Sequence, residues 1–237
     1  MSNITVLGLG AMGSRMASAL LGGGHTVTVW NRTEGKSVGL LAQGALWAPS
    51  PAAAVKHAQF VISMLRDDEA SERAWFGNGG ALAHMPKSAI AIESSTLSWA
   101  WTTALGRQAK AMDIAFLDAP VVGSRPQADA GQLVYLVGGE TAVLDQASAI
   151  LGCMGSAVHH AGPTGSGAVV KLIVNSLFGI QVAALAEALG FAAQAGTPPA
   201  RLLEILGATP VLSTAAKGAG AGMLSGQFAP MFPLELV

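Results

Sequence analysis

Short apolar runs alternate with longer mixed stretches through the first part of the chain. Most of these runs are rich in Val and Ile and apolar at successive positions, as in a strand that is buried on both faces. The segments of strand length are 4–9, 26–30, 59–65, 88–95, 115–122 and 133–139. Burial of both faces predicts a parallel sheet covered by helices, hence an α/β fold over roughly the first 160 residues.

The pattern changes after residue 163 and stays helical. We expect one long helix to about residue 194, a break at 196–200, a helix around 201–206 and a further helical stretch. Gly162 and Pro163 predict the turn between the parts, with Thr164 or Ser166 as the helix N-cap. The sequence therefore predicts a sheet domain over 1–163 and an all-helical domain over 164–237.

The composition of the chain limits the classes of binding partner that we expect. The chain has 13 basic and 14 acidic residues, so we expect no attraction to nucleic acid or to acidic lipid. Polar residues interrupt the apolar segment 168–196, which favours a helix in a core or subunit interface over a membrane span; they are Lys171, Asn175, Gln181 and Glu187. The expected partners are a small molecule and further copies of the chain.

The cysteine, the histidines and the first residues of the chain indicate the cellular compartment and whether a metal site is expected. Cys153 is the only cysteine, which excludes an internal disulfide and fits a reducing compartment. The first residues show no secretion signal, so we expect a cytoplasmic protein. One cysteine and five scattered histidines predict no metal site.

A glycine-rich stretch directly follows the first apolar run. Gly8, Gly10 and Gly13 match G-x-G-x-x-G, with Ala11 and Met12 between the last two. The first glycine suits a tight turn, the second lets backbone approach a pyrophosphate, and the third allows close packing of the next helix. Glycine-rich turns are common, but a strand before, a helix after and a second strand beyond favour a dinucleotide site.

The second strand ends in Asn31, Arg32 and Thr33. NAD-binding domains usually carry an acidic residue here for the ribose 2′-hydroxyl, whereas a guanidinium can bind a 2′-phosphate. We therefore predict NADP(H) as the cofactor. The other interpretation of Arg32 is a solvated surface arginine.

Few residues remain for the chemistry itself. The only tyrosine, Tyr135, has Gly139 four positions later, which excludes a Tyr-x-x-x-Lys dyad. Lys171 and Asn175 lie four residues apart on one face of an apolar helix, where both are costly to bury without a partner. They fit a functional site. They fit equally well a structural role, in which the lysine extends to solvent and the asparagine holds a loop in place.

The sequence resembles the β-hydroxyacid dehydrogenases over its whole length. The resemblance rests on the order and spacing of "GLGAMGSRMA", "WNRT", "SML", "ESSTLS", "DAPVVGS", "GPTGSGAVVKLIVN" and "FAPMFPLELV". It implies an N-terminal Rossmann-type doubly wound sheet, a long inter-domain helix, and a helical C-terminal domain that pairs subunits as a homodimer or higher homo-oligomer.

The resemblance also implies roles for individual residues. Lys171 would be the acid/base residue and Asn175 its companion in substrate binding. Met64 and Leu65 would line the cofactor, and Thr96 would lie near the nicotinamide. The turn formed by Val122, Gly123 and Ser124 would hold the substrate carboxylate through backbone N–H groups and the Ser124 hydroxyl.

Two departures from the family pattern stand out. Relatives often read Ser-Gly-Gly where this chain has Val122, Gly123 and Ser124, which leaves the substrate open. The chain also ends at Val237, before a Lys-Asp pair that the family usually carries. The expected activity is an NADPH-dependent interconversion of small hydroxy acids with their aldehyde or keto forms. The alternatives are an imine reductase of the same fold, against which Lys171 counts, and a catalytically silent NADP-binding protein.

Overall fold

The computed structural model describes residues 1–228. The chain divides into two compact units, Met1–Lys171 and a second unit that begins at Leu172. The boundary predicted after residue 163 falls at the end of the last strand, a few residues before this division. Each unit is described by itself below.

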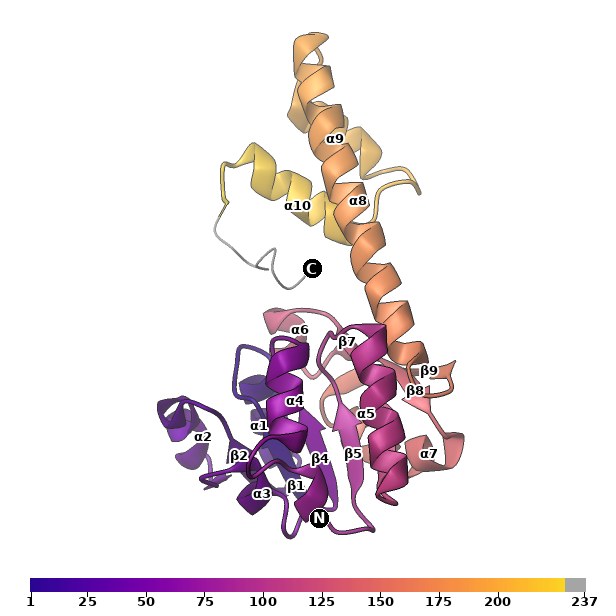
Figure 1. Cartoon of the computed structure of the whole chain (residues 1–237). Coiled ribbons are helices and arrows are strands. Elements are labelled where there is room, and N and C mark those ends of the chain that lie inside the picture. The colour runs from indigo at the N-terminus through magenta and orange to yellow at the C-terminus, as the bar shows by residue number, and fades with distance from the viewer. Residues whose placement is uncertain (229–237) are drawn as a thin grey trace. The chain divides into compact units, whose positions relative to one another are not determined.

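A nine-stranded mixed sheet forms the centre of the first unit (Figure 1). Its order is β3-β2-β1-β4-β5-β6-β8-β7, and β9 pairs with β8. The strands are β1 (Asn3–Leu7), β2 (Thr26–Trp30), β3 (Leu46–Trp47), β4 (Phe60–Ser63), β5 (Ile90–Glu93), β6 (Ala115–Asp118), β7 (Val121–Val122), β8 (Leu133–Gly139) and β9 (Gly155–Gly162).

Helices cover both faces of this sheet, as expected for a doubly wound fold. They are α1 (Gly13–Gly22), α2 (Val38–Leu41), α3 (Pro51–Ala54), α4 (Asp68–Phe76), α5 (Trp99–Ala111), α6 (Arg125–Asp129) and α7 (Thr141–Gly152), with short 3-10 turns η1 (Glu34–Ser37) and η2 (Leu82–His84). Alternate residues of one strand enter different clusters: Ile90 and Ile92 pack in the cluster of α1 and α7, and Ala91 packs in that of α4 and α5. The sheet therefore has a buried core on each side.

The prediction of an all-parallel sheet was wrong at one end. Strands β3, β2, β1, β4, β5 and β6 run parallel to one another, but β8 runs antiparallel to both β6 and β7. The predicted strand 115–122 is also split into β6 and β7, because Pro120 cannot donate a ladder hydrogen bond. The connection 123–132 is shorter than the dozen or so residues of a parallel crossover, so the chain turns back as a hairpin.

The second unit contains helices and no strand among the residues described. Helix α8 (Ser166–Gln194) begins in the first unit and continues into the second, followed by α9 (Pro199–Leu206) and α10 (Thr214–Leu224). Among the described residues of this unit, Leu185, Leu189 and Leu203 form a small buried cluster, against which partly buried residues such as Leu206 and Met223 pack. These helices confirm the predicted all-helical part, whereas the motif "FAPMFPLELV" lies almost wholly outside the described residues.

Helix α8 is apolar along most of its length. By length and composition it could cross a membrane: its most apolar 18-residue segment has a mean hydropathy of 1.8, and 22% of that segment is buried. A core or interface helix of a soluble protein can have the same length and composition, so the sequence expectation of no membrane span stays an expectation.

Candidate active site

Two of the three glycines in the loop between β1 and α1 are required by the packing of the loop itself. Gly8 has φ of +96°, and a Cβ there would lie 2.3 Å from the Met64 carbonyl oxygen. A Cβ on Gly13 would lie 2.0 Å from the Gly8 carbonyl oxygen, so the third glycine lets α1 approach the strand. A Cβ on Gly10 would meet nothing within 4 Å, so this glycine faces open space.

The open space at Gly10 suits a pyrophosphate. No described residue accepts a hydrogen bond from the backbone N–H groups of Ala11 and Met12, which precede the first turn of α1. Free N–H groups before a helix are the ordinary partners of a bound phosphate. The loop geometry therefore fits a dinucleotide.

Asn31 ties the end of β2 to the glycine loop. Its Oδ1 accepts a hydrogen bond from the Leu9 N–H at 3.0 Å, and its Nδ2 donates to the Thr33 carbonyl at 3.0 Å. These bonds fix the turn that carries the exposed Arg32 side chain. Asn31 is thus a residue that shapes this site, whatever it contacts in a ligand.

A pocket of about 380 Å³ collects most of the predicted cofactor residues. From the prediction it contains Gly8, Gly10, Asn31, Arg32, Thr33, Met64 and Leu65. Sequence reasoning missed further lining residues, namely Trp30, Pro51, Arg66, Ala70, Arg73 and Asn78. Arg66 could have been predicted, since it directly follows Met64 and Leu65 in the sequence. Ala11, Met12, Gly13 and Thr96 do not line this pocket.

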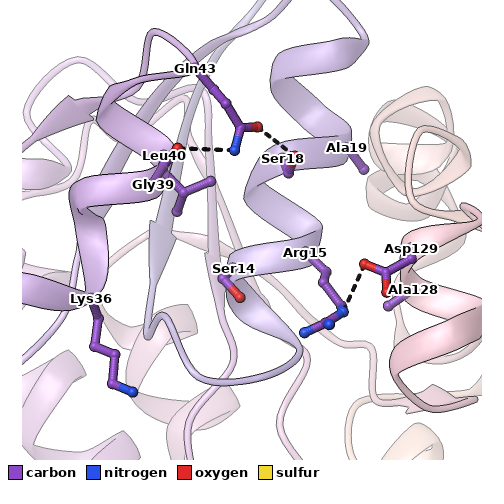
Figure 2. Close-up of a pocket in the computed structure, with 10 residues that line it drawn as sticks. All are labelled: Ser14, Arg15, Ser18, Ala19, Lys36, Gly39, Leu40, Gln43, Ala128 and Asp129. Atoms are coloured by element: carbon purple, nitrogen blue, oxygen red, sulfur yellow. Dashed lines mark hydrogen bonds and ion pairs between the residues drawn. The ribbon is translucent and has the colours of Figure 1, made fainter.

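A larger hollow of about 530 Å³ lies elsewhere in the first unit. Figure 2 shows it between α1, the α2 segment and α6, with Arg15 Nε 2.8 Å from an Asp129 oxygen and Gln43 bonded to Ser18. None of the predicted site residues lines it. Its open, polar walls carry none of the glycine-loop geometry, so the smaller pocket is the candidate cofactor site.

Asp118 holds the start of α8 at the ends of β6 and β8. Its carboxylate is 1% exposed and accepts hydrogen bonds from the N–H groups of Gly165 at 2.7 Å and Ala168 at 2.9 Å. Burial raises the pKa of Asp118, although these N–H groups act in the opposite direction. A Cβ on Gly167 would lie 2.3 Å from the Leu136 carbonyl oxygen, so this glycine is also needed for the close approach.

Lys171 follows this clamped first turn and is only 8% exposed. No described residue accepts a hydrogen bond or forms an ion pair with its ammonium group. Burial lowers the pKa of Lys171 from 10.5 to about 8. A buried amine without a partner is unfavourable in a purely structural role and typical of a functional site.

Asn175 lies one helical turn after Lys171 on α8 and is 9% exposed. Its Nδ2 has no hydrogen-bond partner among the residues described. A buried amide donor that is left unpaired costs about 1–3 kcal/mol unless a ligand or water satisfies it. Both residues singled out from the sequence therefore carry unused polar groups.

The turn at Val122, Gly123 and Ser124 differs from its expected form. Gly123 has φ of +124°, and the Ser124 N–H and hydroxyl both donate to Gln127 Oε1, at 3.0 Å and 3.3 Å. The cause is a capping arrangement at the start of α6, in which a serine is followed three residues later by glutamine. A carboxylate that used these two donors would have to displace the Gln127 side chain.

The chain matches two family models that together cover almost all of it. Residues 3–162 match the model described as the NAD binding domain of 6-phosphogluconate dehydrogenase. Residues 165–237 match the model described as NAD-binding of NADP-dependent 3-hydroxyisobutyrate dehydrogenase. The chain belongs to the β-hydroxyacid dehydrogenase family. These matches support a nicotinamide dinucleotide as the cofactor, without deciding between its two forms.

Named relatives show how far the likeness extends. The chain is 32% identical to glyoxylate/succinic semialdehyde reductase 2, chloroplastic, of Arabidopsis thaliana, over 98% of this chain and 65% of that protein. It is 37% identical to 3-hydroxyisobutyrate dehydrogenase of Pseudomonas aeruginosa, over 87% of this chain and 69% of that protein. It thus spans about two thirds of the length of these relatives.

A solved structure agrees with the family assignment. The structure of Mycobacterium tuberculosis 3-hydroxyisobutyrate dehydrogenase with L-serine matches with a TM-score of 0.85 and 31% identity, over 91% of this chain and 73% of that one. The fold of a Rossmann-type domain followed by helices is therefore that of the family.

Proposed function

We propose that the protein is an NADPH-dependent oxidoreductase that interconverts small hydroxy acids with their aldehyde or keto forms. The observation that carries this proposal is Lys171, a buried amine without a partner that follows directly on the clamped start of α8. The family assignment supports dehydrogenase or reductase chemistry with a nicotinamide cofactor. Lys171 favours this activity over imine reduction and over a silent binding protein.

The first unit fits the cofactor at three points. Gly10 leaves room for the pyrophosphate, the Ala11 and Met12 N–H groups are free to bind it, and Arg32, which lines the pocket, is our candidate for binding a 2′-phosphate. When bound, the nicotinamide supplies or receives the hydride that changes the oxidation state of the substrate carbon. Thr96, beyond the end of β5, is our candidate for the nicotinamide end of the site.

We propose NADP(H) over NAD(H) because the three residues directly after β2, Asn31, Arg32 and Thr33, include no acidic residue. A carboxylate there would repel the 2′-phosphate, whereas Arg32 can form charge-assisted hydrogen bonds to it. The exposed guanidinium of Arg32 has no partner among the residues described. It is therefore available for a ligand.

Lys171 would move the proton at the substrate oxygen. As hydride reaches the carbonyl carbon, negative charge develops on oxygen, and the ammonium stabilises this charge and donates a proton to it. In the oxidising direction the neutral amine accepts the hydroxyl proton. Asn175, with its unused Nδ2 donor, would bind the substrate beside the lysine. The turn of Val122, Gly123 and Ser124 would bind the carboxylate once Gln127 is displaced.

The dependence of both directions on pH tests this assignment. With a pKa of about 8, Lys171 is mostly protonated at pH 7, so kcat/KM for reduction should be flat there and fall above pH 8. The oxidation rate should rise through the same pH range, because that direction needs the neutral amine. In Lys171→Arg, whose guanidinium stays charged, the fall in any remaining reduction should disappear. A parent profile without an inflection between about pH 7 and 9 would contradict the proposal.

We further propose that the protein forms a homo-oligomer through its helical unit. Exposed apolar side chains of α8 recur at helical spacing at Ile173, Leu177 and Ile180. Side chains of this kind are usually covered by another protein surface. A second copy is the occupant implied by the family resemblance.

A further inference from the structure

The buried carboxylate of Glu93 at the end of β5 takes no part in the chemistry proposed above. It is 1% exposed, and three donors surround it. Its Oε2 accepts hydrogen bonds from the Ser71 hydroxyl at 2.7 Å and from the Trp75 indole N–H at 2.9 Å. Its Oε1 accepts a hydrogen bond from the Ser95 backbone N–H at 3.0 Å. Because every partner is a donor, this position requires two acceptor oxygens.

The partners of Glu93 are themselves held by a second set of bonds. The Trp101 indole N–H of α5 donates to Ser71 Oγ at 2.9 Å, which leaves the Ser71 hydroxyl proton to point at Glu93. On the other side, Ser95 Oγ accepts a hydrogen bond from the Leu65 N–H at 2.7 Å. The network therefore connects helices α4 and α5 with the two loops that follow β4 and β5.

Leu65 connects this network to the cofactor pocket. Met64 and Leu65 line the pocket together with Gly8. A Cβ on Gly8 would lie 2.7 Å from Leu65 Cδ2 and 2.3 Å from the Met64 carbonyl oxygen, so the two segments are packed without spare room. A displacement of Leu65 therefore alters the wall against which the dinucleotide would lie.

We propose that Glu93 is a positioning residue for the cofactor. It fixes the turn at Ser95, Ser95 fixes the Leu65 backbone, and Leu65 shapes the pocket beside Gly8. The inference rests on the proposed function only in taking this pocket as the cofactor site. Glutamine cannot replace Glu93, because its NH₂ group would have to face either the Ser95 N–H or the Trp75 N–H.

Cofactor titration of purified variants tests the proposal, with whichever of NADPH and NADH the parent binds more tightly. We expect Glu93→Gln to weaken binding about tenfold and Ser95→Ala about threefold. If Glu93 acts through Ser95, the two effects overlap, so Glu93→Gln should add only about threefold in the Ser95→Ala background. A matched control is Tyr135→Phe in β8, which loses a buried hydroxyl that lies 3.7 Å from Met154 Sδ and should keep the parent affinity.

Two outcomes would overturn the positioning role. One is a Glu93→Gln variant that keeps the parent's cofactor affinity, even if its melting temperature is lower. The other is a double variant whose loss of affinity equals the product of the losses in the two single variants. Should Glu93→Gln not fold, Ser71→Ala decides, since it removes one donor and leaves the charge. An affinity loss of about threefold in Ser71→Ala supports the role, and an unchanged affinity overturns it. A parent that binds neither cofactor would overturn the proposed function itself.

Discussion

The two units of this chain bury their apolar residues to very different extents. In the first unit, alternate strand residues enter two large clusters, one on each side of the sheet, and the residues of β4, β5, β6 and β8 are almost all buried. In the described part of the second unit, the buried cluster consists of three leucines, while large apolar side chains of α8, α9 and α10 are exposed, such as Leu177, Ile205 and Leu224. Large exposed apolar side chains are therefore more concentrated in the described part of the second unit than in the first.

The candidate cofactor pocket and the surface proposed for self-association lie in different units. Every residue of the cofactor pocket lies in the first unit, as does the Asp118 clamp that fixes the start of α8. Lys171 is the last residue of that unit, and Asn175 belongs to the second. We therefore expect substitutions in the pocket of the first unit to change cofactor binding and substitutions on the exposed face of α8 to change association.

The largest effect is expected from Lys171→Met. Reduction should fall about a hundredfold or more, because the proton donor at the developing alkoxide is lost. Cofactor affinity should stay within about twofold, since the pocket residues are unchanged. Steady-state kinetics and a cofactor titration measure the two effects, with exposed Lys110→Met on α5 as the control.

The same substitution should stabilise the first unit, which a structural lysine would not do. The folded-state pKa of Lys171 lies below its unfolded value, so burial of the ammonium opposes folding by about 3 kcal/mol at pH below 8. This penalty disappears as the pH rises from 8 through 10.5. We expect Lys171→Met to raise the melting temperature at pH 7 and to do so less at pH 10. A lower melting temperature together with near-parent turnover would make Lys171 a structural residue.

The next largest effect concerns the cofactor. Arg32→Ala should weaken NADPH binding about tenfold to a hundredfold, because a charge-assisted contact to the 2′-phosphate is worth about 1.5–3 kcal/mol. NADH binding should barely change. The control Arg107→Ala removes an exposed arginine of α5 that does not line the pocket. Equal weakening of both cofactors by Arg32→Ala would contradict the assignment of NADP(H).

Most of the first unit could be predicted because its strands are continuous apolar runs. Strand β3 was missed, since it has only two residues and both are exposed. Strand β9 was missed as well, because "GSAVHHAG" contains glycines at both ends and two histidines. The antiparallel direction of β8 depends on its pairing with β6 and β7, and the periodicity within a single strand does not indicate direction.

Which residues line the candidate pocket was predictable from the sequence only where a local pattern decides it. The glycine spacing identified the loop, and the position after β2 identified Asn31, Arg32 and Thr33. The ordinary pKa of lysine, about 10.4, would keep Lys171 charged well above neutral pH. Its lowered pKa of about 8 follows from burial in the folded chain, which no local pattern encodes. The engagement of Ser124 by Gln127 likewise appears only in the folded turn.

A smaller effect should come from the exposed face of the second unit. If copies associate through α8, Leu177→Ala should weaken association about tenfold, since removing the part of a buried leucine side chain beyond Cβ costs on the order of 1.5 kcal/mol. Cofactor affinity should not change, because the pocket lies wholly in the first unit. Sedimentation at several concentrations measures the association, with Gln194→Ala, an exposed polar position on the same helix, as the control. A parent that is monomeric at all concentrations would contradict self-association.

The smallest effect is expected from Asn175→Ala. The unused Nδ2 donor of Asn175 would contribute one hydrogen bond to the substrate, worth about 0.5–1.5 kcal/mol, so KM should rise about threefold to tenfold. The value of kcat should change less, because the proton donor and the cofactor pocket are untouched. Removing a buried donor without a partner should also leave the melting temperature equal or higher. Steady-state kinetics and a thermal melt give all three numbers. A kcat that falls as far as in Lys171→Met would mean that Asn175 acts on the proton transfer itself, and an unchanged KM would mean that it does not contact the substrate.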